Sequence, residues 1–194
     1  MTTTASFIQH IERFTGPISS EETSTILSCF HVQTNAKKTC VLEVGTPCDS
    51  LFFVLQGCLR SYYIKDKGTE QTLDFAIEKW WLTDFMAFEY ESVSNFYIQA
   101  VETTQLLRIS KLDFQLLLTQ HPRMEKYFRC VFQRAYAAAQ YRVKFLYEFS
   151  REELYFHFEK NFPDFIQRIP QYLLASYLGF SPQYLSEIKK KRFS

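Results

Sequence analysis

The chain has 194 residues, a length that suits one large domain or two small ones. Hydrophobic residues make up 46% of it and aromatic residues 18%, which excludes a disordered chain, a collagen or a coiled-coil rod. The 22 basic side chains nearly balance the 21 acidic ones, so a protein that coats nucleic acid through bulk charge is excluded as well. Any binding of nucleic acid must therefore be local.

The cysteines are odd in number and widely spaced, at positions 29, 40, 48, 58 and 130. This spacing predicts reduced thiols rather than a disulfide scaffold or a paired-cysteine zinc site. The first residues show no basic region followed by an apolar stretch, and no apolar run approaches the ~18 residues of a membrane span. We therefore expect a cytoplasmic protein without a bound metal.

The first 120 residues divide into a helical and a β-rich part. Apolar positions between residues 6 and 28 recur at helical spacing, with a break at Gly16-Pro17 and Ser19 or Ser20 as a cap. From residue 37 to 110 short apolar runs alternate with turn residues, as is typical of a β-sandwich or barrel with many short strands. The predicted strands cover residues 41–42, 51–55, 59–64, 72–77 and 97–101.

A helix from 112 to 119 precedes a long helix that starts at Pro122 and ends at Phe149. Its apolar positions alternate steps of four and three, which predicts a seam against a second copy of the same helix and hence a homodimer. The alternative is a helix buried only within its own monomer. The candidate dimerisation residues are Phe128, Val131, Ala135, Ala138, Arg142 and Phe145.

The residues from Ser150 to Glu153 have the form of a capping box, which places a boundary and a new helix there. Further on, residues 171–190 fit a helix-turn-helix. Ala175 is small where two helices would cross, Gly179 suits a left-handed turn, and Ser181 and Pro182 suit the start of the second helix. The second helix would fit the major groove of DNA, and the cationic run at 189–192 would contact phosphates. An ordinary helical hairpin is the alternative.

The candidate DNA-binding residues lie on the outward side of this second helix or at its start. They are Ser181, Gln183, Tyr184, Ser186, Glu187, Lys189 and Lys190. Gln183 could bond adenine and Glu187 could accept from cytosine.

The order of these parts resembles the Crp/Fnr family of transcription regulators over nearly the whole chain, and most closely the short members from Bacteroidetes-type bacteria. The motifs that carry the resemblance are Leu-Phe-Phe-Val-Leu-Gln-Gly at 51–57 and Arg-Ile-Pro-Gln-Tyr-Leu-Leu-Ala-Ser-Tyr-Leu-Gly at 168–179. It implies an α+β fold with a double-stranded β-helix (jelly-roll) sensor domain at 1–120. A dimerisation helix at 121–149 and a DNA-binding helix-turn-helix domain at 150–194 would follow.

The resemblance also implies a cyclic-nucleotide pocket whose residues would be Thr83, Asp84, Phe85, Ser94 and Asn95. Cyclic-nucleotide binders of this family carry a Gly-Glu pair for the ribose and an Arg for the cyclic phosphate. In this chain Thr83 and Asp84 occupy the positions of the Gly-Glu pair, and Ser94 occupies the position of the Arg. Because a buried anion is costly without a cationic partner, we expect weak or absent binding of cyclic AMP.

The expected function is that of a transcription regulator that binds double-stranded DNA, with an unidentified effector and no cofactor. The alternative is a ligand-binding or protein-interaction module whose helix-turn-helix is vestigial. An enzyme is not expected, because the four histidines at 10, 31, 121 and 157 are scattered and no catalytic motif is present.

Overall fold

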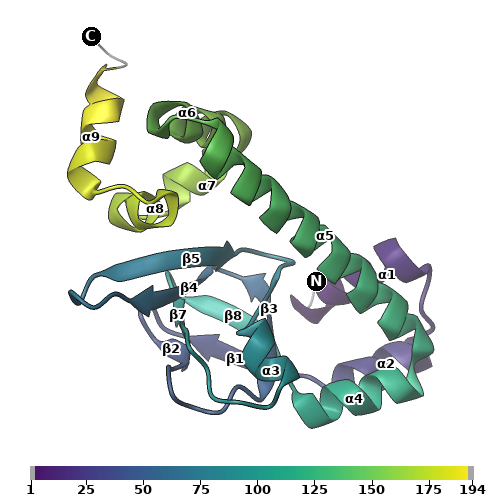
Figure 1. Ribbon diagram of the computed structural model, residues 1–194. Helices are drawn as coiled ribbons and strands as arrows, with labels where there is room; N and C mark the ends of the chain where they lie inside the picture. The colour runs from purple at the N-terminus through teal and green to yellow at the C-terminus, as the bar shows by residue number, and fades with distance from the viewer. Residues whose placement is uncertain (1–2, 192–194) are drawn as a thin grey trace. The chain divides into compact units, whose positions relative to one another are not determined.

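The computed structural model describes residues 3–191, and the chain forms two compact units. The first unit contains residues 1–63 and 74–132, and the second contains 64–73 and 133–194. A long helix, α5 (Pro122–Glu148), begins in the first unit and continues into the second (Figure 1). Both units bury apolar side chains in a core of their own.

Two four-stranded β-sheets make up the β-rich part of the chain (Figure 1). The strands are β1 (His31–Asn35), β2 (Cys40–Leu42), β3 (Ser50–Gln56), β4 (Leu59–Ile64), β5 (Glu70–Ala76), β6 (Trp81–Leu82), β7 (Tyr97–Ala100) and β8 (Thr104–Ser110). Their order is β1-β8-β3-β6 in one sheet and β2-β7-β4-β5 in the other. The arrangement confirms the predicted jelly-roll domain.

Each of the five predicted strand segments corresponds to a strand, with ends that differ by at most two residues. The strands β1, β6 and β8 were not among the predicted segments. β1 reads His-Val-Gln-Thr-Asn and is exposed or half-buried throughout, so it shows no apolar alternation. β6 has two residues, too few for any periodicity. β3, in contrast, is an unbroken apolar run because it lies inside its sheet between β8 and β6 and Phe7 packs on Phe53.

The first unit also contains helices. They are α1 (Thr3–Thr15), α2 (Ser20–Ser28), α3 (Phe85–Glu89) and α4 (Lys111–Gln120), followed by the start of α5. Of the two predicted caps for α2, Ser19 has this role, since its Oγ accepts a 3.1 Å hydrogen bond from the Glu22 N–H. The helix break at Gly16 is also confirmed, with φ +85° at that residue.

An aromatic cluster joins α1, the sheet and α5 inside the first unit. The Tyr127 side chain on α5 is fully buried. Its hydroxyl accepts a 2.9 Å hydrogen bond from Trp81 Nε1 on β6 and lies 2.9 Å from Nδ1 of His10 on α1. The rings of Phe7 and Phe128 pack edge-on against it. Burial raises the pKa of Tyr127 well above the usual tyrosine value, so the hydroxyl stays protonated.

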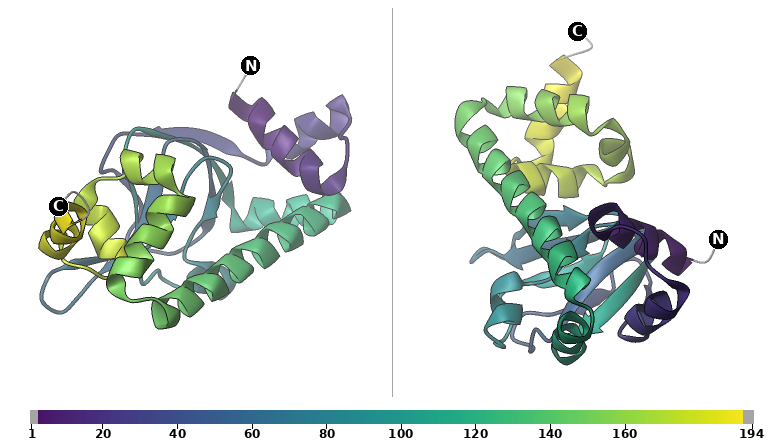
Figure 2. Two further views of the ribbon diagram at one scale, coloured as in Figure 1. Left: turned by 90° about the horizontal axis from the view of Figure 1, so that it is seen from above. Right: turned by 90° about the vertical axis from the view of Figure 1, so that its right-hand side faces the viewer.

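The second unit consists mainly of helices, coloured green to yellow in Figure 2. After α5 come α6 (Arg151–Asn161), α7 (Pro163–Arg168), α8 (Gln171–Leu178) and α9 (Pro182–Lys191). The predicted capping box at the start of α6 is confirmed. Glu153 N–H donates to Ser150 Oγ at 3.3 Å, and Ser150 N–H donates to Glu153 Oε2 at 2.8 Å. Hydrogen bonds from the Ser150 side chain and from its backbone N–H to the Glu153 carboxylate lower the pKa of Glu153.

Candidate nucleic-acid interface and ligand segment

The turn between α8 and α9 is built as the sequence predicted. Gly179 ends α8 in the left-handed region at φ +78°. Phe180 N–H then donates to the carbonyl of Ala175 at 2.8 Å, which closes the end of the helix. Ala175 is fully buried, in agreement with the need for a small residue there.

The start of α9 is fixed by Ser181, whose Oγ accepts a 3.1 Å hydrogen bond from the Tyr184 N–H. Pro182 occupies the first helical position, where a missing N–H costs nothing. The side chains predicted to face inward are all buried: Leu174, Leu178, Phe180, Leu185 and Ile188. Local chemistry therefore sets both the turn and the rotation of α9 about its axis.

Burial of these side chains leaves one side of α9 open to solvent. Of the candidate DNA-binding residues, Ser181, Gln183, Ser186, Glu187 and Lys190 are exposed, while Tyr184 and Lys189 are half-buried. The Arg151 guanidinium at the start of α6 lies 5.7 Å from the centre of the Tyr184 ring. The structure thus gathers all seven candidates on one short helix and its cap.

The cationic end of α9 is tied to α6. Lys191 Nζ lies 2.8 Å from Glu152 Oε1, and hydrogen bonding to Glu152 raises the pKa of Lys191. Lys189 Nζ lies 6.0 Å from the centre of the Tyr155 ring. Arg192, the last residue of the predicted cationic run, lies outside the described residues.

The predicted ligand segment of the first unit is organised around a carboxylate. Asp84 is 2% exposed and is the N-cap of α3. Its Oδ1 accepts a 3.1 Å hydrogen bond from the Ala87 N–H, and its Oδ2 accepts a 3.0 Å hydrogen bond from the Asn95 N–H. Ser94 Oγ lies 3.1 Å from the same Oδ2 and 2.9 Å from the carbonyl oxygen of Phe96, so its proton serves one of these acceptors.

The neighbouring residues complete this internal network. Thr83 donates to the carbonyl of Ser50 at 2.8 Å, and the buried Cys48 Sγ lies 3.2 Å from Thr83 Oγ1. Burial raises the pKa of the Cys48 thiol. The Phe85 side chain lies outside this network and packs edge-on against the ring of Phe132.

The structure therefore brings Thr83, Asp84, Ser94 and Asn95 together, as the resemblance implied. Within residues 3–191, no ion pair involves Asp84. Its carboxylate is balanced by hydrogen-bond donors of the segment 84–95 instead. The signal for this capping role was the Asp directly before a short helix, a preference of N-cap positions.

The candidate dimerisation residues differ in accessibility along α5. Phe128 is 3% exposed and packs against Trp81 and Phe114, so it belongs to the core of the first unit rather than to an open seam. Val131 also packs partly against that core. Ala135 and Ala138 are exposed.

The last two candidates on α5 make contacts within the second unit. Arg142 stacks on the ring of Tyr177, 4.1 Å from its centre, and donates to the Tyr177 carbonyl at 3.3 Å. Phe145 stacks on Phe149 and contacts the ring of His157.

Two searches of the described residues complete the survey. Among residues 3–191, no helix is both long and apolar enough to cross a membrane. In the same part of the chain, no group of three or more His, Cys, Asp or Glu side chains is arranged to hold a metal ion.

Comparisons with known proteins agree with this architecture. Residues 32–121 match the family model of the cyclic nucleotide-binding domain. No curated protein sequence matches the chain significantly.

Several solved structures resemble the chain over most of its length. The global regulator CLP of Xanthomonas campestris, described as responsive to c-di-GMP, is 17% identical with a TM-score of 0.72, over 89% of this chain and 91% of that one. FixK2 of Bradyrhizobium japonicum is 12% identical with a TM-score of 0.67, over 84% and 83% of the two chains. The catabolite activator protein of Thermus thermophilus is 20% identical with a TM-score of 0.57, over 94% and 85%. At these identities the likeness establishes the fold.

Proposed function

Residues 32–121 form a domain of the cyclic nucleotide-binding family within a chain that has the fold of Crp/Fnr-type transcription regulators, and from this premise we propose that the protein is a regulator that binds double-stranded DNA as a homodimer. The observation that carries the proposal is the α8–α9 pair. Its inner side chains are buried, its turn is closed by Gly179, and the polar side of α9 is open. The proposal includes no catalytic step.

The open side of α9 has the chemistry of a major-groove reader. Gln183 can make two hydrogen bonds to adenine, and Glu187 can accept one from the amino group of cytosine. Lys189 and Lys190, at the C-terminal end of the helix, would contact phosphates and contribute to affinity without reading sequence.

A homodimer is proposed to form through the second part of α5. Large side chains there are open to solvent in the single chain: Tyr136 is 67% exposed and Tyr147 is 88% exposed, with Val143 and Leu146 about half exposed. Ala135 and Ala138 would let two such helices approach closely. The two α9 helices would then have to lie about 34 Å apart to enter successive major grooves.

The ligand segment supports a regulator that does not depend on cyclic AMP. The backbone donors that could face a phosphate are already bonded to Asp84, and a cyclic phosphate would lie next to this buried carboxylate. Loss of an arginine partner alone would weaken binding by about 2–5 kcal/mol. Calorimetric titration of the full chain with cyclic AMP and cyclic GMP tests this, and binding in the micromolar range or tighter would contradict it.

DNA binding is tested by fluorescence anisotropy with the upstream region of the protein's own gene and a scrambled duplex, at several salt concentrations. The proposal predicts tighter binding to the upstream region in the absence of any effector. The double variant Lys189→Ala/Lys190→Ala should bind all duplexes more weakly, with a salt slope shallower by about 3.6, because the homodimer loses four phosphate contacts and each removes about 0.9. Lys37→Ala/Lys38→Ala, a matched pair of exposed lysines in the first unit, should bind like the wild type.

An unchanged salt slope in the Lys189/Lys190 variant would support the alternative, a protein-interaction module with a vestigial helix-turn-helix. The oligomeric state is measured separately by analytical ultracentrifugation. Ala135→Glu/Ala138→Glu should give a monomer, because it places four carboxylates in the dimer seam, whereas the control Lys126→Glu should remain dimeric. A dimeric Ala135/Ala138 variant would exclude this seam.

A further inference from the structure

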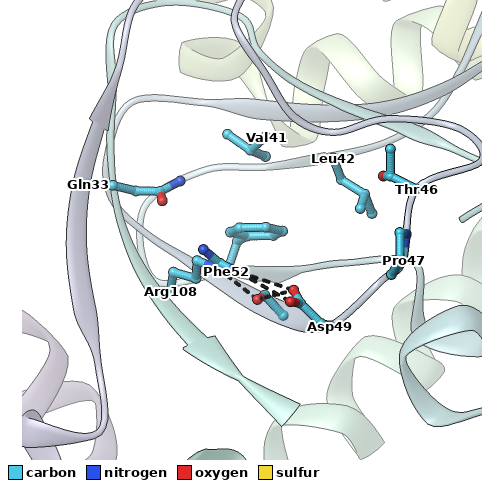
Figure 3. A pocket seen from close by; sticks show the side chains of 9 residues that line it. Gln33, Val41, Leu42, Thr46, Pro47, Asp49, Phe52 and Arg108 are labelled. Atoms are coloured by element: carbon cyan, nitrogen blue, oxygen red, sulfur yellow. Dashed lines mark hydrogen bonds and ion pairs between the residues drawn. The ribbon is translucent and has the colours of Figure 1, made fainter. Parts of the chain in front are cut away.

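A polar pocket lies in the first unit next to the ligand segment, whose Thr83 donates to the carbonyl of the lining residue Ser50 (Figure 3). Its volume is about 260 Å³. It is lined by Gln33 from β1, Val41 and Leu42 from β2, Thr46 and Pro47 from the following loop, Asp49 just before β3, Ser50 and Phe52 from β3, and Arg108 from β8.

The charged part of this pocket is a connected set of three side chains. Arg108 Nη2 lies 3.2 Å from Asp49 Oδ1 and 3.5 Å from Oδ2, and Arg108 Nε donates to Ser50 Oγ at 2.7 Å. Ser50 Oγ in turn donates to Asp49 Oδ1 at 2.6 Å. The serine hydroxyl therefore bridges the two charged groups. Dashed lines in Figure 3 run between Arg108 and Asp49.

Some polar groups of the pocket can still form hydrogen bonds to a ligand. Within residues 3–191, neither Arg108 Nη1 nor the side-chain amide of Gln33 makes a hydrogen bond. The Arg108 and Asp49 side chains are 42% and 63% exposed, so both can take a further partner from solvent. The pocket thus offers donors at Arg108 and Gln33 and acceptors at Asp49.

The charges of the lining decide which class of ligand is favoured. Arg108 and Asp49 are the charged lining residues, and their charges cancel. A simple anion would have to compete with Asp49 for the guanidinium, and a simple cation would have to compete with Arg108 for the carboxylate. A zwitterion satisfies both groups without separating them, because its carboxylate can bind Arg108 while its ammonium binds Asp49.

The volume of the pocket limits the size of the ligand. A volume of 260 Å³ is slightly below the range of pockets for drug-sized ligands. Phe52 lies beside Arg108 in Figure 3, and Val41, Leu42 and Pro47 complete the apolar part of a lining whose accessible surface is mainly polar. A molecule of the size of leucine matches these dimensions.

We propose that this pocket, the Arg108–Asp49 pocket, binds a free α-amino acid with a small or medium side chain. The α-carboxylate would accept from Arg108 Nη1 and the Gln33 amide, and the α-ammonium would donate to Asp49. The residues that line this site belong neither to the segment 83–95 nor to α9, although Thr46 and Ser50 accept hydrogen bonds from Ser94 and Thr83. Its test does not involve DNA, so the proposed regulatory function and this proposal can fail independently.

The experiment is a titration of the full-length, ¹⁵N-labelled protein with L-leucine, followed by amide chemical shifts. We expect saturation with a dissociation constant on the order of 1 mM or tighter. The matched probes are 4-methylpentanoate, which lacks the ammonium group, and 3-methylbutylamine, which lacks the carboxylate. Each should bind about 10-fold more weakly or worse, because each leaves one charged group of the pocket without its second partner.

Arg108→Gln and Asp49→Asn should each weaken leucine binding by about 10-fold or more. Arg123→Gln is the matched control, because Arg123 forms a comparable ion pair with Glu22, at 3.0 Å, in the same unit. Should the pocket variants fail to fold, the wild-type shift changes must cluster at Gln33, Thr46, Asp49 and Arg108. The proposal is overturned by an absence of saturation up to about 10 mM, by shifts that cluster elsewhere, or by 4-methylpentanoate binding as tightly as leucine.

Discussion

Replacing Tyr127 with Phe removes one oxygen atom from the middle of the first unit and leaves the ring in place. The hydroxyl is fully buried and bonds Trp81 Nε1 at 2.9 Å and His10 Nδ1 at 2.9 Å. In Tyr127→Phe the indole N–H is left in an apolar environment, at a cost of about 1–3 kcal/mol, while the half-buried imidazole loses one hydrogen bond worth about 1 kcal/mol. We therefore expect the free energy of unfolding to fall by about 2–4 kcal/mol.

Urea unfolding followed by circular dichroism measures this change without using the fluorescence of Trp81, whose surroundings are altered. The midpoint should move to lower urea while the slope with denaturant stays the same, because the surface exposed on unfolding hardly changes. Tyr90→Phe, at a tyrosine that is 73% exposed in the same unit, is the control and should have almost no effect. A loss of less than about 0.5 kcal/mol in Tyr127→Phe would refute the hydrogen-bonded assignment of this cluster.

Three further predictions concern the first unit. Burial raises the pKa of Tyr127 in the folded state, so above about pH 10 only the unfolded tyrosine ionises. The free energy of unfolding should then fall by up to about 1.4 kcal/mol per pH unit. Tyr127→Phe should lose this part of the pH dependence. Gly57→Ala should cost more than about 2 kcal/mol in urea unfolding because a Cβ there would lie 2.7 Å from Thr104 Cα, whereas Gly68→Ala, with open space around it and φ +77°, should cost about 1 kcal/mol. Asp84→Ala removes a helix cap, which should lower the free energy of unfolding by about 1–2 kcal/mol and with it the midpoint of thermal unfolding. An unchanged midpoint would contradict the capping role.

Local chemistry explains which features the sequence predicts well. Ser181, Gly179 and Ser150 act on backbone groups within four residues of themselves, so their roles follow from their own neighbourhood in the chain. The strand β4 was predicted with the bounds that the structure shows, because it ends at turn residues on both sides. In such cases the residue and the groups that it interacts with lie in one short segment of the sequence, so both can be identified from it.

Features that depend on distant segments were missed or misplaced. β1 is polar and becomes a strand only by pairing with β8, about seventy positions later. Phe128 fits the predicted seam by its spacing, yet Trp81 and Phe114 take it into the core. The same limit applies to Arg108, whose pocket needs Gln33 and Asp49 from two other parts of the chain.

The ligand segment shows how one substitution changes the meaning of its neighbours. The family resemblance implies that Asp84 stands at the ribose-binding position and that Ser94 replaces the phosphate partner, which predicts a weakened nucleotide site. In the structure the Asp84 carboxylate bonds the Ala87 and Asn95 amides, and it does so without an ion pair. The segment thus carries its own acceptor for these amides, so a bound anion is not needed to satisfy them. Phe85, next in the chain, packs edge-on against Phe132, so the capped helix α3 is in contact with α5.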